Sequence, residues 1–221
     1  MRAYFSEGGV SIFHGDARDV LKHLEVLPER GVVVTDPVWP NAPDGMFPGI
    51  EDPAGLFAET AAHFPRLVRR AVIHLGCMSD PRFLAGVPSA LPFVRAVYLR
   101  LAVPSYLGTV LGGGDFAYVF GSREPAEGKR VLPGECTSSD PRGRETKEHP
   151  CPRKLEHVRW LVGTFTRSGD SVLDPFCGSG TTLIAAKNRG RRAIGIEREE
   201  RFCELAARRL SQGVLALGGA A

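Results

Sequence analysis

The fold of this chain is decided by one stretch of sequence, SVLDPFCGSG at residues 171–180. The apolar run that ends at Asp174 predicts a buried strand, and Gly178 and Gly180 predict a tight turn before a helix. A second strand follows the helix and ends at Glu197. Glycines that let the backbone approach a ligand, followed about 20 residues later by an acid that accepts hydrogen bonds from ribose hydroxyls, predict a site for an adenosine-containing cofactor.

The helix after this turn has unsatisfied N-terminal amides, which suit a pyrophosphate or a carboxylate. The turn lacks the Gly-Lys-Ser/Thr ending of a phosphate-binding loop. A carboxylate such as the methionine end of S-adenosylmethionine would fit this position, as a pyrophosphate outside a phosphate-binding loop would. The alternative is a tight structural turn in an unrelated α/β protein, which the placement of Glu197 disfavours.

A second candidate site lies near the start of the chain, at Asp36-Pro37-Val38-Trp39. The β-branched run at 32–35 predicts a buried strand, whose carboxyl end opens into the crevice where α/β sheets bind ligands. Chemistry on a nucleic-acid base requires the base to be flipped out, stacked on an aromatic ring and held by its Watson–Crick edge. Trp39 supplies a stacking surface, while Asp36 and the Pro37 carbonyl accept hydrogen bonds from an exocyclic amine. The alternative is a strand end followed by a proline-stiffened loop.

Together the two sites resemble the signatures of the amino-methyltransferases of DNA, which methylate adenine N6 or cytosine N4. Residues 36–39 are similar to the family's Asp-Pro-Pro-Tyr/Trp motif, and residues 176–180 to its Phe-x-Gly-x-Gly motif. The catalytic motif comes first and the cofactor motif last, an order that resembles the permuted β group of the family. Val38 replaces the second proline, which leaves the acid and the aromatic residue in place.

Two further segments resemble family motifs. Residues 149–154, His-Pro-Cys-Pro-Arg-Lys, are similar to the His-Pro-x-x-Lys-Pro stretch of the cofactor pocket, with Arg153 keeping the cation. Gly15-Asp16-Ala17 is similar to the segment whose acid approaches the adenine of the cofactor. The resemblance implies catalytic roles for Asp36, Pro37 and Trp39. It implies cofactor-binding roles for Asp16, Ala17, Asp36, Arg153, Asp174, Phe176, Gly178, Ser179, Gly180, Thr181, Glu197 and Arg198.

Strands that alternate with helices predict an α/β fold with a mainly parallel, doubly wound sheet. The resemblance implies the Rossmann-like methyltransferase type, in one domain over residues 1–221. Within it we expect a catalytic half at 1–121, a polar recognition loop at 122–148 and a cofactor-binding half at 149–212. We also expect strands at 10–13, 71–75, 93–103 and 116–120, and helices at 17–24, 53–67, 154–165 and 199–210.

The segment 122–148 is rich in Gly, Pro and charged residues and predicts an exposed, mobile loop. It lies where such enzymes carry their target-recognition region. A short loop implies a short site, relaxed specificity, or a second copy of the chain that shares the duplex as a homodimer. Its cations are candidates for contacts to phosphates or guanines, with a solvated loop as the alternative. These cations are Arg123, Lys129, Arg130, Arg142, Arg144 and Lys147.

The net charge of +3 permits nucleic acid as a partner without requiring it. Since no apolar run reaches the roughly 18 residues of a membrane span and no targeting signal is evident, we expect a cytoplasmic protein. The five scattered cysteines predict reduced thiols and no metal, although Cys136 and Cys151 flank His149 and leave a metal site as an alternative. His14, His74 and His157 have no evident catalytic partner, and the cluster Arg66, Arg69 and Arg70 is interpreted as a solvated helix end.

The sequence thus predicts a site-specific DNA methyltransferase that uses S-adenosyl-L-methionine and acts on double-stranded DNA, of the kind found in restriction–modification. The target is the exocyclic amine of a flipped base, adenine N6 ahead of cytosine N4. A non-catalytic DNA- or cofactor-binding module is the alternative of a different class, and it would be expected to have lost Asp36 or the glycines. Methylation of a protein amide or of an RNA base is disfavoured by the order of the motifs.

Overall fold

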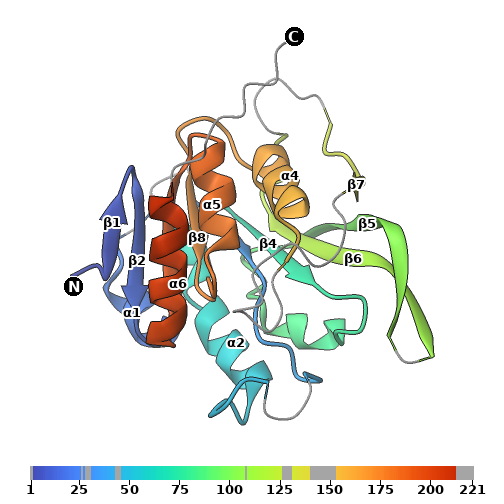
Figure 1. Ribbon diagram of the computed structural model, residues 1–221, viewed down its shortest axis with the longest axis horizontal. Coiled ribbons are helices and arrows are strands. Elements are labelled where there is room, and N and C mark those ends of the chain that lie inside the picture. The colour runs from blue at the N-terminus through green and yellow to red at the C-terminus, as the bar shows by residue number, and fades with distance from the viewer. Residues whose placement is uncertain are drawn as a thin grey trace.

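The computed structural model of the protein describes residues 2–25, 27, 31–42, 46–107, 109–125, 131–139 and 153–212. These residues form one sheet with helices on both faces (Figure 1). The strands are β1 (Phe5–Glu7), β2 (Val10–His14), β3 (Gly31–Thr35), β4 (Arg70–Leu75), β5 (Phe93–Leu107), β6 (Val110–Gly121), β7 (Glu135–Ser138), β8 (Ser171–Asp174) and β9 (Arg192–Glu197). The helices are α1 (Ala17–His23), α2 (Pro53–Ala61), α3 (Phe64–Leu67), α4 (Leu155–Phe165), α5 (Thr181–Asn188) and α6 (Glu200–Ser211), with a 3-10 helix at Pro81–Gly86.

The strands lie in the order β1-β2-β9-β8-β3-β4-β6-β5-β7. The five strands from β2 to β4 pair in parallel, whereas β6 is antiparallel to both β4 and β5. This confirms the α/β fold with a mostly parallel sheet. From β3 the chain continues to β4 on one side, while from β8 it continues to β9 on the other side. The carboxyl ends of β3 and β8 therefore meet at the switch point where open α/β sheets bind ligands.

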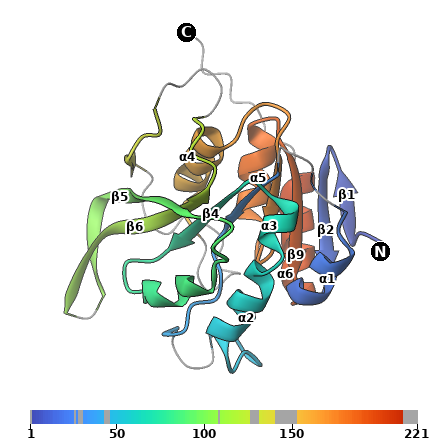
Figure 2. The same ribbon diagram turned by 180° about the vertical axis from the view of Figure 1, so that it is seen from behind.

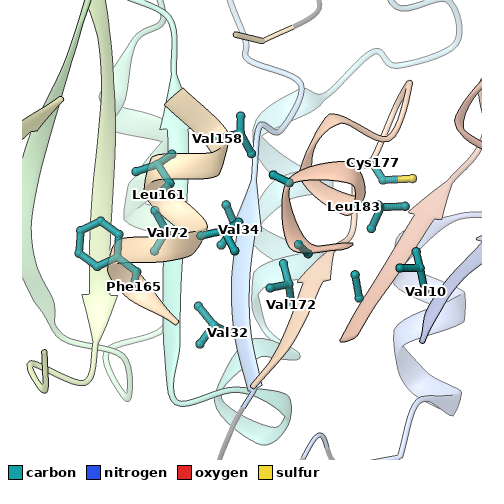
Figure 3. Packing of buried hydrophobic residues seen from close by; sticks show 14 of the residues in the cluster. Val10, Val32, Val34, Val72, Val158, Leu161, Phe165, Val172, Cys177 and Leu183 are labelled. Atoms are coloured by element: carbon teal, nitrogen blue, oxygen red, sulfur yellow. The ribbon is translucent and has the colours of Figure 1, made fainter. Parts of the chain in front are cut away.

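Each face of the sheet carries its own hydrophobic core. On one face α4, α5 and α6 pack through residues such as Leu161, Phe165 and Leu183 against Val34 and Val172 of the central strands (Figure 3). On the opposite face, seen in Figure 2, α1, α2 and α3 cover the sheet. The central strand β3 is buried at every position because it is covered on both faces. No helix in the described part of the chain has the length and apolarity needed to cross a membrane.

The structure corrects three expectations from the sequence. The helix predicted at 53–67 is divided into α2 and α3, since Pro65 has no N–H to continue the helical hydrogen bonds. The segment predicted as a loop at 122–148 contains the strand β7, which pairs with Tyr98–Leu101 of β5. Of the three arginines interpreted as a solvated helix end, Arg66 does lie exposed in the last turn of α3, whereas Arg69 is half-buried and Arg70 is buried. Arg66 donates to the carbonyls of Leu21 and Leu24, and Arg69 pairs with Asp170 at 2.6 Å.

Arg70 is the largest fully buried side chain among the described residues, at 1% exposure. Its guanidinium donates to the carbonyl of Phe165 at 2.6 Å, to that of Ser122 at 2.8 and 3.0 Å, and to that of Glu124. Burial lowers the pKa of Arg70 to about 10, and the guanidinium stays cationic at neutral pH. The side chain therefore fastens the end of β6 and the end of α4 to the start of β4.

We expect Arg70→Ala to lower the free energy of unfolding by about 3 kcal/mol or more, because it leaves buried carbonyls without donors and opens a cavity. Urea denaturation followed by circular dichroism measures this loss. Arg192→Ala removes the same charge from an exposed position and should stay within about 0.5 kcal/mol of the parent protein. Equal unfolding curves for the two variants would contradict the role given to Arg70.

Candidate active site

A cavity of about 300 Å³ opens at the carboxyl ends of β3, β8 and β9. Small-molecule sites begin at about this size. Every residue with a catalytic or cofactor-binding role predicted from the sequence lines it, except Gly180. The parallel pairing explains this, because Asp36, Asp174 and Glu197 each stand at or directly after the end of a neighbouring strand. Residues from both ends of the sequence are thus brought to one edge of the sheet.

The glycine turn between β8 and α5 needs its glycines. Gly178 has φ +49° and Gly180 has φ +80°, a region that other residues adopt with strain. A Cβ on Gly180 would also lie 2.9 Å from the Cβ of Ala206. Gly180 therefore shapes the turn by packing against α6, while Gly178 faces the cavity.

Glu197 ties this turn to the end of β9. Its Oε2 accepts a hydrogen bond from the Gly178 amide at 2.9 Å, and its Oε1 accepts one from the Glu199 amide at 2.8 Å. Burial raises the pKa of Glu197, against the lowering effect of hydrogen bonds from backbone amides. Because a carboxylate offers about four acceptor positions, Glu197 can also accept from a ligand in the cavity.

Ser179 and Thr181 are held by a cation from α6. Arg209 donates through Nη1 to the carbonyl and the hydroxyl of Ser179 at 2.6 and 2.9 Å, and to the Thr181 hydroxyl at 3.4 Å. The guanidinium thereby fixes the first turn of α5 on the floor of the cavity. The contacts of Arg209 with Ser179 and Thr181 were not predicted from the sequence.

Asp174 is buried between the glycine turn and β3. Its Oδ1 accepts hydrogen bonds from the Thr35 hydroxyl at 2.7 Å and from the Phe176 amide at 3.2 Å. Burial raises the pKa of Asp174 to about 6, although hydrogen bonds from Thr35, Thr182 and Phe176 oppose the shift. The carboxyl group therefore releases its proton at about pH 6. None of these hydrogen-bond partners is a cation.

This shift predicts a pH dependence of stability. Because the folded-state pKa of about 6 lies above the ordinary value of 3.8, the contribution of Asp174 to the free energy of unfolding falls as the pH rises from about 4 through 6. Asp174→Asn keeps an acceptor for Thr35 and Phe176 but has no proton to lose. We therefore expect the free energy of unfolding of the parent protein, measured in urea, to fall relative to that of Asp174→Asn by about 2–3 kcal/mol between about pH 4 and pH 6. A constant difference across the pH range would contradict the assignment.

The adenine side of the predicted cofactor pocket begins at Asp16. This residue caps the N-terminus of α1, and its carboxylate accepts from the Arg18 amide at 2.9 Å and from the Arg18 guanidinium at 2.8 and 3.0 Å. The side-chain hydrogen bond from Arg18 is the main cause that lowers the pKa of Asp16. Arg198, which also lines the cavity, donates to the carbonyls of Pro48 and Gly49 at 2.6 and 3.1 Å. It therefore links β9 to the loop that follows Trp39.

The other half of the cavity holds Asp36, Trp39 and Arg153. Arg153 donates to both carboxylate oxygens of Asp36, through Nε at 2.6 Å and through Nη2 at 2.8 Å. Its guanidinium carbon also lies over the Trp39 ring, 5.5 Å from the ring centroid. The Trp39 ring in turn packs edge-on against Phe47 at 5.4 Å. Arg153, which the resemblance implies binds the cofactor, thus contacts both the acid and the aromatic ring of the predicted catalytic motif.

A polar pair behind Arg153 was missed by the sequence analysis. His74 of β4 and Asp115 of β6 approach through Nε2 and Oδ2 at 3.1 Å, and Arg153 Nη1 donates to the same oxygen at 3.2 Å. His74 is buried, in line with its assignment to packing or surface, and it pairs with Asp115, whereas His14 and His157 each bond to a backbone carbonyl. His74 and Asp115 meet because β4 and β6 lie antiparallel in the sheet, and no local sequence motif predicts this contact.

Several predicted features fall outside the described residues. These are residues 149–152 of the motif that resembles His-Pro-x-x-Lys-Pro, and the cations Lys129, Arg130, Arg142, Arg144 and Lys147. Arg123 is described and exposed. His149 and Cys151 of the alternative metal site are also outside. Within the described part of the chain no group of three or more His, Cys, Asp or Glu residues could hold a metal ion.

Comparison with known proteins agrees with this geometry. The profile of a DNA methylase family, named for N6 and N4 methylation, matches residues 32–208. The type II methyltransferase M2.DpnII of Streptococcus pneumoniae is 41% identical over 63 residues, which are 28% of this chain and 24% of that protein. YubD of Escherichia coli K12, assigned as a methylase, is 35% identical over 100 residues, which are 44% of this chain and 41% of YubD.

Solved structures extend the similarity over nearly the whole chain. A protein of Thermus thermophilus assigned as a DNA modification methylase, solved with S-adenosyl-L-methionine, has a TM-score of 0.64 and 26% identity. The match covers 93% of this chain and 96% of that one. By contrast, the chain spans only about a quarter to two fifths of the length of the curated relatives named above.

Proposed function

The chain belongs to the N6/N4 DNA methylase family, and from that premise we propose that it transfers a methyl group from S-adenosyl-L-methionine to an exocyclic amine of a base in double-stranded DNA. One observation carries the proposal. The acid and aromatic ring of residues 36–39 and the glycine turn with Glu197 line the same cavity. A base held on Asp36 and a cofactor held on the glycine turn would therefore be neighbours, and proximity is the main requirement of this reaction.

The cofactor half fits S-adenosyl-L-methionine in the chemistry of its donors and acceptors. The carboxylate of Glu197 suits the ribose hydroxyls, and the amides at the start of α5 suit the carboxylate of the methionine end. Asp16, Ala17, Phe176 and Arg198 extend the same wall and are proposed to enclose the adenine. The cofactor supplies an electrophilic methyl group.

The catalytic half would position the amine. The Asp36 carboxylate and the Pro37 carbonyl would each accept a hydrogen bond from one N–H of the exocyclic amine. These two hydrogen bonds would direct the nitrogen lone pair away from both acceptors and toward the cofactor. Trp39 stacks on the flipped base and keeps its ring in one plane. Neither step asks the protein for covalent chemistry, so the rate enhancement comes from orientation and from the fixed carboxylate.

We propose adenine N6 as the target. Cytosine N4 remains the alternative, because both amines present two N–H groups to the same acceptors, Asp36 and Pro37. The experiment is expression in a host without DNA methylation, followed by nucleoside digestion and mass spectrometry of the host DNA. N6-methyldeoxyadenosine is expected, and N4-methyldeoxycytidine would reassign the base. If neither is found while the protein is folded and binds cofactor, the proposed function is wrong. Sequencing of the same DNA maps the recognition site.

Trp39 should act through its ring face. Base stacking on an aromatic side chain contributes about 1–3 kcal/mol. Trp39→Phe keeps a smaller face and is expected to lose about threefold in kcat/KM, whereas Trp39→Ala should lose about tenfold or more. Steady-state methyl transfer to the mapped site measures both. An equal loss in the two variants would show that the ring face is not what the enzyme uses.

We place the base chemistry in residues 1–121 and the cofactor chemistry in residues 149–212, with DNA contacts from the cations of segment 122–148. A second copy of the chain that shares the duplex as a homodimer is part of this proposal, as is a role in the cytoplasm. The relatives named type II methyltransferases support a modification role beside a restriction enzyme.

A further inference from the structure

The guanidinium of Arg153 lies where the proposed function needs a base. It is a flat, cationic group over the Trp39 ring, with its carbon 5.5 Å from the ring centroid. Two of its nitrogens donate to both oxygens of Asp36 at 2.6 and 2.8 Å. A target base would also be flat, would stack on the same ring and would donate to the same carboxylate through its amine. Arg153 therefore makes, from within the chain, the contacts expected of the substrate.

We propose that Arg153 is a base-mimicking gate, which holds the target-base site closed and swings from Asp36 to Asp115 when a base enters. The proposal rests on the proposed function for the identity of the base site. The side chain of Arg153 is only 12% exposed, and its contact with Asp36 uses both carboxylate oxygens. A base and this guanidinium cannot hold Trp39 and Asp36 at the same time.

Asp115 gives the displaced guanidinium a place to go. Arg153 Nη1 already donates to Asp115 Oδ2 at 3.2 Å, so the side chain can leave Asp36 without leaving its charge unpaired. Burial alone would raise the pKa of Asp115, but the hydrogen bond from His74 and the charges of His74, Arg153 and His157 outweigh it and lower the pKa. Asp115 therefore remains an anion that can receive the guanidinium. The hydrogen bond between His74 Nε2 and Asp115 Oδ2, at 3.1 Å, holds the Asp115 carboxylate in place.

Such a gate sets a threshold for base entry. If the site is open in only a fraction of molecules, the apparent dissociation constant for a base rises by the inverse of that fraction. A base that stacks on Trp39 and donates to Asp36 can displace the guanidinium, whereas a base that makes only one of these contacts cannot. Loss of the gate should therefore tighten base binding, the opposite of what loss of an ordinary contact residue does.

Gly76 offers a way to weaken the gate without removing charge. A Cβ at Gly76 would lie 3.2 and 3.5 Å from the Nη1 and Nη2 atoms of Arg153. Gly76→Ala would therefore shift the guanidinium by a few tenths of an ångström while the chain keeps its net charge. Arg192→Ala is the matched control for charge, because Arg192 is exposed and lies at the opposite end of β9 from the cavity.

The test follows base entry by the fluorescence of Trp39. The chain has two tryptophans, so Trp160→Phe leaves Trp39 as the only one. The probe is a duplex that carries the mapped site with its target base opposite an abasic position, titrated in the presence of S-adenosylhomocysteine. Such an unpaired base is flipped at low cost. In this background Arg153→Ala should bind the duplex about tenfold more tightly than Arg192→Ala, and Gly76→Ala about twofold more tightly than the parent.

Equal or weaker binding by Arg153→Ala relative to Arg192→Ala overturns the gate. If Arg153→Ala does not fold, Gly76→Ala decides, and unchanged or weaker binding by this variant overturns the gate as well. The readout needs no methyl transfer. If the host DNA gives no mapped site, titration with dAMP and dCMP replaces the duplex, with the same expected order of variants. Tighter binding by Arg153→Ala, together with a parent protein that methylates no DNA, would support the gate and contradict the proposed function.

Discussion

Asp36→Ala is expected to lower the rate of methyl transfer by about 10³-fold while the affinity for S-adenosylhomocysteine stays within about twofold. The carboxylate is the acceptor that orients the amine, and no other described carboxylate stands at the end of β3. Its carboxylate accepts from Arg153, and within the described part of the chain no hydrogen bond joins it to the glycine turn. Turnover and cofactor binding should therefore separate in this variant.

Single-turnover methyl transfer to the mapped site measures the first quantity, and calorimetric titration measures the second. Asp36→Asn is the matched control, because its amide oxygen still accepts one hydrogen bond although the charge is gone. It should lie between the parent protein and Asp36→Ala. A folded Asp36→Ala protein that methylates DNA at a near-normal rate would remove Asp36 from the mechanism.

Glu197→Ala is expected to weaken cofactor binding by about 100-fold. The side chain accepts from Gly178 and Glu199 at 2.9 and 2.8 Å, so its loss loosens the glycine turn and removes the acceptors proposed for the ribose. Hydrogen bonds to charged groups contribute about 1.5–3 kcal/mol each, which supports a loss of this size.

Calorimetric titration with S-adenosylhomocysteine checks this value against two controls. Glu197→Gln keeps one neutral acceptor and should retain an intermediate affinity. Glu200→Ala removes the same charge from an exposed position on α6 and should bind like the parent protein. If Glu197→Ala and Glu200→Ala bind equally well, the ribose does not contact Glu197.

The sequence predicted the edge of the sheet where the cavity lies, since Asp36, Asp174 and Glu197 each mark the end of an apolar run. In a parallel sheet those ends share one side, so motifs more than 130 residues apart along the chain could be placed together before the structure was known. The N-cap role of Asp16 was also predictable, because an acid that opens a helix bonds its own first turn.

Long-range pairing decided what the sequence could not show. The contact between His74 and Asp115 depends on the antiparallel register of β4 and β6, and β7 forms only because β5 offers it an edge. The low apolar content of Glu135–Ser138 gave no signal of a strand. Likewise the charge of Arg70 suggested solvent, although carbonyls from Ser122, Glu124 and Phe165 surround it in the core. The contacts of Arg153 with Asp36 and Trp39 likewise depend on the tertiary structure and could not be predicted from the sequence.

The most direct test of the account uses purified protein, S-adenosyl-L-methionine with a tritiated methyl group, and bacterial DNA that carries no methylation. Methyl transfer to DNA through Asp36 requires that label enters the DNA, is recovered on an exocyclic amine of adenine or cytosine after nucleoside digestion, and falls about 10³-fold with Asp36→Ala. A folded protein that binds S-adenosylhomocysteine but leaves the DNA unlabelled would contradict it.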